Sequence, residues 1–184
     1  PDLRAVLERY NALVRRVRGL RMPVVCAVNG VAAGAGANLA LACDIVLAAK
    51  SANFIQAFSR IGLIPDCGGT YFLPRLAGLQ KAAAFMMLGD KVSAAEAEKY
   101  GMIYKSYEEK EFESSVNQIA AALSMLPTRA LMLTRAALMQ SFGNSLDQQL
   151  ELEKGLQHEA GHTADFREGV TAFFEKRRPS FIGK

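Results

Sequence analysis

The segment from residue 24 to residue 42 constrains the fold most, because its pattern changes twice within a few residues. It begins with the short apolar run Val24–Val28, which predicts a β-strand that ends at the turn signal Asn29-Gly30. Residues 31–37 then contain two glycines and four alanines, and the apolar run 39–42 predicts a helix that starts here. The chain therefore passes from a strand through a turn of small residues into a helix.

The turn of small residues has two possible roles. The first turn of a helix carries free backbone N–H groups at the positive end of the helix dipole. Side chains no larger than a methyl group let a ligand oxygen approach those groups, so this turn could bind an oxyanion. The same residues could instead serve tight packing of the helix against the strand, which composition alone favours.

Four segments spread over nearly the whole chain carry a longer pattern. They are NGVAAGAGANLALACDIV (29–46), IGLIPDCGGTYFLPRLAG (61–78), GDKVSAAEAEKYGMI (89–103) and DFREGVTAFFEKRRPSF (165–181). Together they resemble the enoyl-CoA hydratase/isomerase family, also called the crotonase superfamily. The resemblance implies an α/β fold: a crotonase (ClpP-like) spiral of ββα repeats, N-terminally truncated, in residues 1–125, with a C-terminal helical oligomerisation region in residues 126–184.

The resemblance implies a site in which two backbone N–H groups hold the carbonyl oxygen of an acyl-CoA thioester as it becomes an enolate. One of these donors maps to Ala35, and alanine suffices because the donor is a backbone group. The family's other donor comes from a segment well upstream of Pro23, whereas only 22 residues precede Pro23 here. We therefore expect a chain without the family's N-terminal strands, lacking half of the oxyanion hole, with weak or no activity by itself.

The residues before Pro23 carry a different pattern. Seven apolar side chains recur at helical spacing and predict a packing helix over residues 2–18. They are Leu3, Val6, Leu7, Tyr10, Leu13, Val14 and Val17.

The catalytic carboxylates distinguish the branches of this family. In the hydratases two glutamates grip the water that adds to the double bond, and the matching positions here are Asn38 and Phe58. Neither side chain can act as a general base, so we assign both to the substrate pocket and expect poor hydration.

Asp66, directly after Pro65, stands where several isomerases of the family carry aspartate. A single carboxylate beside an apolar acyl pocket can remove a proton from one carbon and return it to another through the same enolate. Asp66 is therefore the candidate catalytic residue of an isomerase. The alternative interpretation makes it a turn or cap residue ahead of a predicted helix over residues 69–76.

Within the family, the combination of Asn38, Phe58 and Asp66 most resembles the ring-epoxyphenylacetyl-CoA isomerases of phenylacetate degradation. The implied reactions are conversion of ring-1,2-epoxyphenylacetyl-CoA to oxepin-CoA and the shift of a double bond from the β,γ to the α,β position. The alternatives are an enoyl-CoA isomerase or hydratase-like enzyme of fatty-acid oxidation and a catalytically silent acyl-CoA-binding module.

The C-terminal region suggests further contacts. Three helices are predicted after Pro127, over residues 130–142, 145–159 and 165–178, and in the family such helices build trimers, often stacked into hexamers. Phe173 and Lys176 match the family's contacts to the nucleotide end of coenzyme A. The basic cluster that begins at Lys176 could instead be only the solvated end of the predicted helix.

Composition excludes some classes of partner. The chain has 22 basic and 18 acidic residues, a net charge of +4 spread along its length, which does not indicate binding to nucleic acid. We find no apolar stretch of membrane length, so no membrane partner is expected and a cytoplasmic enzyme is the default. The acyl-CoA substrate implies no separate cofactor, because coenzyme A is part of the substrate.

The cysteines and histidines do not predict a metal site. Cys26, Cys43 and Cys67 form no CxxC pair and are expected to be reduced packing residues. His158 and His162 could share a helix face, but no third ligand is visible and Gly161 interrupts the pattern.

Overall fold

The computed structural model describes residues 2–184, which divide into two compact units. The first unit comprises residues 2–20 and 24–118, and the second comprises residues 21–23 and 119–184. The sequence analysis placed the boundary between the spiral core and the helical region at residue 125. Helix α6, Glu109–Ser124, leads from the first unit into the second and has no counterpart among the predicted helices.

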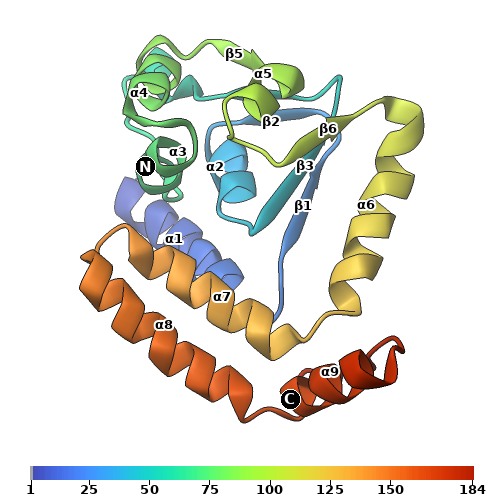
Figure 1. Cartoon of the computed structure of the whole chain (residues 1–184). Helices are drawn as coiled ribbons and strands as arrows, with labels where there is room; N and C mark the ends of the chain where they lie inside the picture. Colours follow the sequence, from blue (N-terminus) through green and yellow to red (C-terminus); the bar gives the residue numbers. More distant parts are fainter. Residues whose placement is uncertain (1) are drawn as a thin grey trace. The chain divides into compact units, whose positions relative to one another are not determined.

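The first unit contains the strands of the described residues and the helices that precede α6 (Figure 1). The strands are β1 (Val25–Val28), β2 (Val31–Ala33), β3 (Ile45–Ala49), β4 (Asn53–Ile55), β5 (Lys91–Ser93) and β6 (Lys105–Tyr107). The helices are α1 (Leu3–Gly19), α2 (Ala35–Leu41), the 3₁₀-helix η1 (Ala57–Ile61), α3 (Gly69–Ala77), α4 (Leu79–Leu88) and α5 (Ala94–Lys99).

The strands form two small sheets of three strands each. In the first sheet, ordered β1-β3-β6, all pairs are parallel, and Cys26 lies opposite Val46. In the second, ordered β2-β4-β5, β2 pairs parallel with β4 and β4 pairs antiparallel with β5. The turn at Asn29-Gly30 therefore moves the chain from one sheet to the other, and part of the predicted small-residue turn is strand β2.

Helix α2 lies between the β1-β3-β6 sheet and helix α3 (Figure 1). Its buried residues include Ala37 and Ala40, and these small side chains let the helix approach Val46 and Ala48 of β3 within one core cluster. The packing role proposed for the small residues is therefore present, and it coexists with an open helix start.

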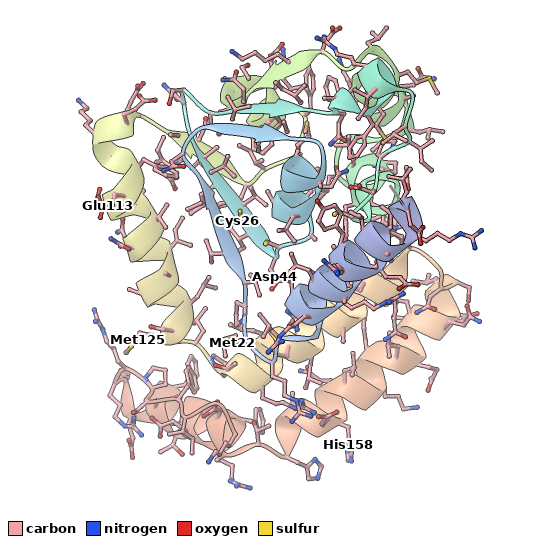
Figure 2. The ribbon with its side chains drawn as sticks, turned by 180° about the vertical axis from the view of Figure 1, so that it is seen from behind. Met22, Cys26, Asp44, Glu113, Met125 and His158 are labelled. Atoms are coloured by element: carbon pink, nitrogen blue, oxygen red, sulfur yellow. The ribbon has the colours of Figure 1, made fainter. Side chains whose placement is uncertain are left out.

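Helix α1 confirms the predicted helix before Pro23, but its apolar side chains Leu3, Val6, Tyr10 and Leu13 remain exposed. The end of α1 is tied down by Arg18, whose Nη1 donates to Asp44 Oδ1 at 2.8 Å and to the carbonyl of Ala42 at 3.1 Å. Asp44, labelled in Figure 2, also accepts the backbone N–H of Val24 through Oδ2 at 2.8 Å. One carboxylate thus joins α1 to the starts of β1 and β3.

A capping box opens helix α5. Ser93 Oγ accepts the N–H of Glu96 at 3.3 Å, and Glu96 Oε2 accepts the N–H of Ser93 at 3.0 Å. The helix ends at Lys99, just before Gly101, whose φ of 73° suits glycine.

The second unit is helical. It contains the end of α6 together with α7 (Thr128–Ser141), α8 (Leu146–Gly161) and α9 (Ala164–Glu175), and α7 runs beside α8 (Figure 1). Helix α9 ends earlier than predicted, because Lys176 adopts a left-handed conformation with φ 54°. None of the described helices combines the length and the apolar character needed to cross a bilayer.

Candidate active site

The start of α2 is shaped by Gly34. Its φ of 52° is unfavourable for residues with a Cβ, and its N–H donates to the carbonyl of Ile55 at 2.8 Å. The N–H of Asn38 donates to Gly34 O at 3.1 Å, so the N–H groups of the first turn, including that of the half-buried Ala35, have no partner within the helix. Ala35 is therefore placed where a backbone donor could meet an incoming oxygen.

Asp66 lies in a tight turn between η1 and α3. Cys67 and Gly68 follow with φ values of 49° and 76°, and the N–H of Gly69 closes the turn on Asp66 O at 2.9 Å. A residue other than glycine in the left-handed region is strained, and such strain is frequent at functional sites.

The side chain of Asp66 does not cap helix α3. The N-cap position belongs to Gly68 and has no side-chain hydrogen bond, which removes the capping alternative. Asp66 Oδ1 is buried and has no hydrogen-bond partner among the described residues. A buried carboxylate oxygen without a partner is costly, and its presence calls for a ligand or a functional role.

Asn38 joins the two parts of the site. It is fully buried on α2, and its Nδ2 donates to the carbonyl oxygen of Asp66 at 2.9 Å. Its Oδ1 accepts a hydrogen bond from Gln56 Nε2 at 2.7 Å. The sequence analysis did not single out Gln56, because nothing in the local pattern after β4 indicates that this glutamine is buried beside α2.

Phe58 lies on η1 and is also buried. Its ring faces Gly34, since a Cβ at that glycine would be 3.5 Å from the ring carbon Cζ. The structure therefore brings Phe58 and Asp66 to helix α2, which carries Ala35 and Asn38. Neither Asn38 nor Phe58 supplies a carboxylate to this site.

Cys67 is buried beside Asp66. Burial, followed by the negative charge and hydrogen bonding of Asp66, raises the pKa of its thiol to about 11. The thiol is therefore protonated near neutral pH and is a poor nucleophile. Cys26 and Cys43 are half-buried and unbridged, and the thiol of Cys43 donates to the carbonyl of Leu39 at 3.6 Å.

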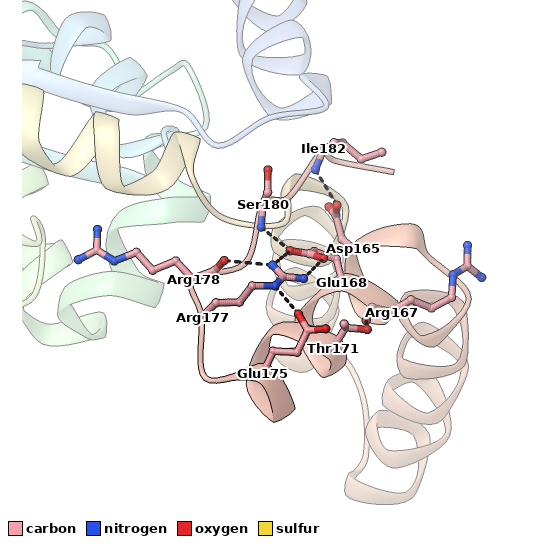
Figure 3. A network of polar contacts seen from close by, with 9 residues as sticks. All are labelled: Asp165, Arg167, Glu168, Thr171, Glu175, Arg177, Arg178, Ser180 and Ile182. Atoms are coloured by element: carbon pink, nitrogen blue, oxygen red, sulfur yellow. Dashed lines mark hydrogen bonds and ion pairs between the residues drawn. The ribbon is translucent and has the colours of Figure 1, made fainter.

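The two candidate coenzyme A contacts lie on α9, in the second unit. Phe173 is 79% exposed, and Lys176 is exposed at the helix end. Arg177, by contrast, is engaged within the chain: its guanidinium donates to both carboxylate oxygens of Glu168, at 2.6 and 2.9 Å, and to Glu175 at 2.6 Å (Figure 3). The positive charge of the predicted basic cluster is thus partly neutralised.

The two histidines lie close together at the end of α8. His158, labelled in Figure 2, lies on α8, and its carbonyl oxygen is 2.7 Å from Nδ1 of His162. Among residues 2–184 no group of three or more potential metal ligands is clustered.

Comparisons with known proteins find relatives that match nearly the whole chain. Residues 4–184 match the family described as enoyl-CoA hydratase/isomerase. The 1,2-epoxyphenylacetyl-CoA isomerase of Escherichia coli is 51% identical over 100% of this chain and 71% of that protein. A probable enoyl-CoA hydratase of Rhodobacter capsulatus is 47% identical over 100% of this chain and 72% of its own length. The crystal structure of an enoyl-CoA hydratase from Bacillus anthracis superposes with a TM-score of 0.94 at 33% identity, covering 99% of this chain and 70% of that one.

Proposed function

The chain belongs to the enoyl-CoA hydratase/isomerase family, and from this premise we propose that it is an acyl-CoA isomerase that moves one proton through a thioester enolate. The observation that carries the proposal is Asp66 Oδ1, a buried carboxylate oxygen without a partner, on a loop bound to the start of α2. Such an oxygen is available to accept a proton from a bound substrate.

In this proposal Asp66 takes a proton from the α-carbon of a β,γ-enoyl thioester, and the C–H electron pair enters the conjugated dienolate. The carboxylic acid then returns the same proton to the γ-carbon, which leaves the α,β isomer and restores the carboxylate. The backbone N–H of Ala35 would donate to the thioester oxygen as it gains negative charge. Donors of this kind contribute about 3–4 kcal/mol to lowering a barrier.

The other side chains of the site favour isomerisation over hydration. Water addition needs groups that activate water, and Asn38 and Phe58 offer no basic atom for it. Their proposed roles are in forming the substrate pocket: Phe58 through its ring against Gly34 and Asn38 through the loop that it holds.

The proposed acyl group follows from the relative that is 51% identical, which is named for 1,2-epoxyphenylacetyl-CoA. We therefore propose ring-1,2-epoxyphenylacetyl-CoA, converted to its oxepin isomer, as the first substrate to test after a simple β,γ-enoyl-CoA. Phe173 and Lys176 are proposed contacts of the nucleotide portion of coenzyme A, through an aromatic face and a cation respectively. We also propose that the protein assembles as a homotrimer or hexamer and that it needs no separate cofactor.

The test is an ultraviolet assay of the protein in its natural length, following conversion of a β,γ-enoyl-CoA to the conjugated isomer. The Asp66→Asn variant should lose conversion while it retains thioester binding, and Asp147→Asn, an exposed carboxylate on α8, serves as the matched control. Crotonyl-CoA hydration is measured in parallel, because one relative is named as a probable enoyl-CoA hydratase. Conversion that survives Asp66→Asn would remove Asp66 from the mechanism, and binding without any turnover would favour a silent acyl-CoA-binding module.

A further inference from the structure

We propose that Gln56 is a positioning residue of the candidate site: through Asn38 it holds the Asp66 loop against the start of α2. The inference deepens the proposed function, on which it rests for the role of Asp66. Gln56 itself lies one hydrogen bond further away and acts only through Asn38.

The orientation of both side-chain amides follows from the acceptor that Asn38 binds, the backbone oxygen of Asp66. The backbone oxygen of Asp66 can only accept, so Asn38 must turn Nδ2 toward it. That orientation leaves Oδ1 of Asn38 facing Gln56, which must then present its Nε2. The Asp66 carbonyl on one side and Nε2 of Gln56 on the other thus favour the same orientation of Asn38, the one that binds the loop.

Because Gln56 is buried, its polar amide carries a cost in free energy that packing alone does not explain. Gln56 is only 2% exposed, and its Oε1 is buried with no hydrogen-bond partner among residues 2–184. A buried unpaired acceptor destabilises a fold, whereas an apolar side chain of similar shape would avoid the cost. The part of the Gln56 amide that is used is the donor, which points to the orientation of Asn38 as its purpose.

The loop itself needs external support. Its turn contains the strained residue Cys67, and both hydrogen bonds to Asp66 O, from Asn38 Nδ2 and from the N–H of Gly69, measure 2.9 Å. Strained backbone persists only where surrounding contacts over-determine it. The bond from Asn38 is the one that connects this turn to α2.

Three ionisable residues can be placed near these amides. Asp66 and Cys67 lie on the loop itself. Arg60, which pairs with Asp90 at 3.7 Å, lies near the backbone of Gln56, since its Nε and the Gln56 carbonyl are each 3.3 Å from a Cβ built on Gly89. These are the neighbouring charges that would affect the pKa of a glutamate introduced at position 56.

Two substitutions test the donor directly. Gln56→Glu keeps the shape, and its carboxyl can donate to Asn38 Oδ1 only while it is protonated, at the raised pKa expected of a buried acid. Gln56→Met removes the donor at every pH but also removes the unpaired Oε1. Gln118→Glu, on the exposed face of α6, is the matched control for the added charge.

We expect kcat of Gln56→Glu, relative to the unchanged protein at each pH, to fall roughly tenfold to a hundredfold as pH rises through the pKa of Glu at position 56, because the carboxylate loses its alignment. Gln56→Met should show a similar loss at every pH while its unfolding midpoint stays equal or rises. If the role of Gln56 is purely structural, Gln56→Met should lose stability and kcat together. The relative kcat of Gln56→Glu should then show no fall with rising pH. Gln118→Glu should follow the unchanged protein throughout.

A second readout does not depend on catalysis. Amide hydrogen exchange of the Gly69 N–H, which donates to Asp66 O, reports the order of the loop in both variants. Its protection should decrease about tenfold in Gln56→Met, the equivalent of one lost hydrogen bond. Unchanged protection would overturn the positioning role of Gln56 even in an active enzyme. If the unchanged protein isomerises no thioester, the proposed function fails and the exchange measurement alone decides the role of Gln56.

Discussion

Gly69 and Asn38 are in contact so close that only glycine can occupy position 69. A Cβ built on Gly69 would lie 2.3 Å from Asn38 Nδ2 and 2.6 Å from Oδ1, well inside van der Waals distance. Gly69 is also the first residue of α3, so the start of α3 packs directly against the buried Asn38 amide of α2. The absence of a side chain at Gly69 is therefore what lets Asn38 reach the Asp66 carbonyl.

The first prediction follows from this contact. Gly69→Ala should lower the free energy of unfolding by about 1–3 kcal/mol, because overpacking displaces a buried side chain. It should also lower the proposed isomerase activity, since the displaced Asn38 amide is the group that binds the Asp66 carbonyl. Urea unfolding and the ultraviolet assay measure both effects. Gly19→Ala, at an exposed helix end with nothing within 4 Å of the added Cβ, is the control and should be close to neutral.

The second prediction concerns the thiol of Cys67. With a pKa of about 11, its alkylation rate should rise about tenfold per pH unit between pH 7 and pH 10, because only the thiolate reacts. Asp66→Asn should increase the rate at a given pH by removing a neighbouring negative charge, although burial still keeps the pKa above its ordinary value. Iodoacetamide labelling mapped by mass spectrometry separates Cys67 from the other two cysteines. A labelling rate that levels off near pH 8 would contradict this picture.

The third prediction concerns the C-terminal residues 179–184. Asp165 is buried, and its carboxylate accepts the N–H of Ile182 at 2.7 Å and that of Gly183 at 2.9 Å. Asp165→Asn replaces one acceptor by an NH₂ group that faces a backbone N–H, which should weaken this attachment by about 1–3 kcal/mol. Faster hydrogen exchange and proteolysis within residues 179–184 would be the result. The exposed Asp147→Asn should leave both rates unchanged, and a variant of Asp165 with wild-type protection would show that the attachment lies elsewhere.

The fourth prediction is a pH dependence at the end of α9. The side chain of Arg177, and then the backbone N–H of Ser180, lower the pKa of Glu168 to about 2 (Figure 3). Because the folded pKa lies below the unfolded one, this contact contributes stability above about pH 4, and the contribution is lost as pH falls through about 2. Carboxyl NMR titration should therefore show Glu168 ionised at pH 3, and in Arg177→Ala its midpoint should move back toward the ordinary value. A midpoint near pH 4 in the unchanged protein would show that the ion pair does not form in solution.

Local structure could be read from the sequence where short-range physics decides it. The strand over residues 24–28, the helix that starts at Ala35 and the capping box of Ser93 and Glu96 depend on neighbouring residues, and all three are present. Several elements have no predicted counterpart, among them β2, the later strands β3 to β6 and helix α6. Strand β2 is three small or exposed residues whose pairing with β4 comes from tertiary contact.

The site divides in the same way. The chemistry-bearing residue types, a lone aspartate at position 66, an asparagine at 38 and a phenylalanine at 58, can be read directly from the chain. Their convergence around Ala35 depends on the parallel pairing of β2 with β4, which brings residues 31–33 beside residues 53–55. No local pattern specifies that pairing.

The sequence by itself determined the family, the strand-turn-helix that presents Ala35 and the position of the aspartate proposed for proton transfer, because these depend on residue type and near neighbours. Only the tertiary structure decided that Gln56 is buried against Asn38, that Asn38 binds the Asp66 carbonyl and that Gly69 leaves room for both. Those contacts join segments 18 and 28 residues apart in the chain. Their physical reason is burial: once the packed core excludes water, each amide must find its partner in whichever segment the fold brings near.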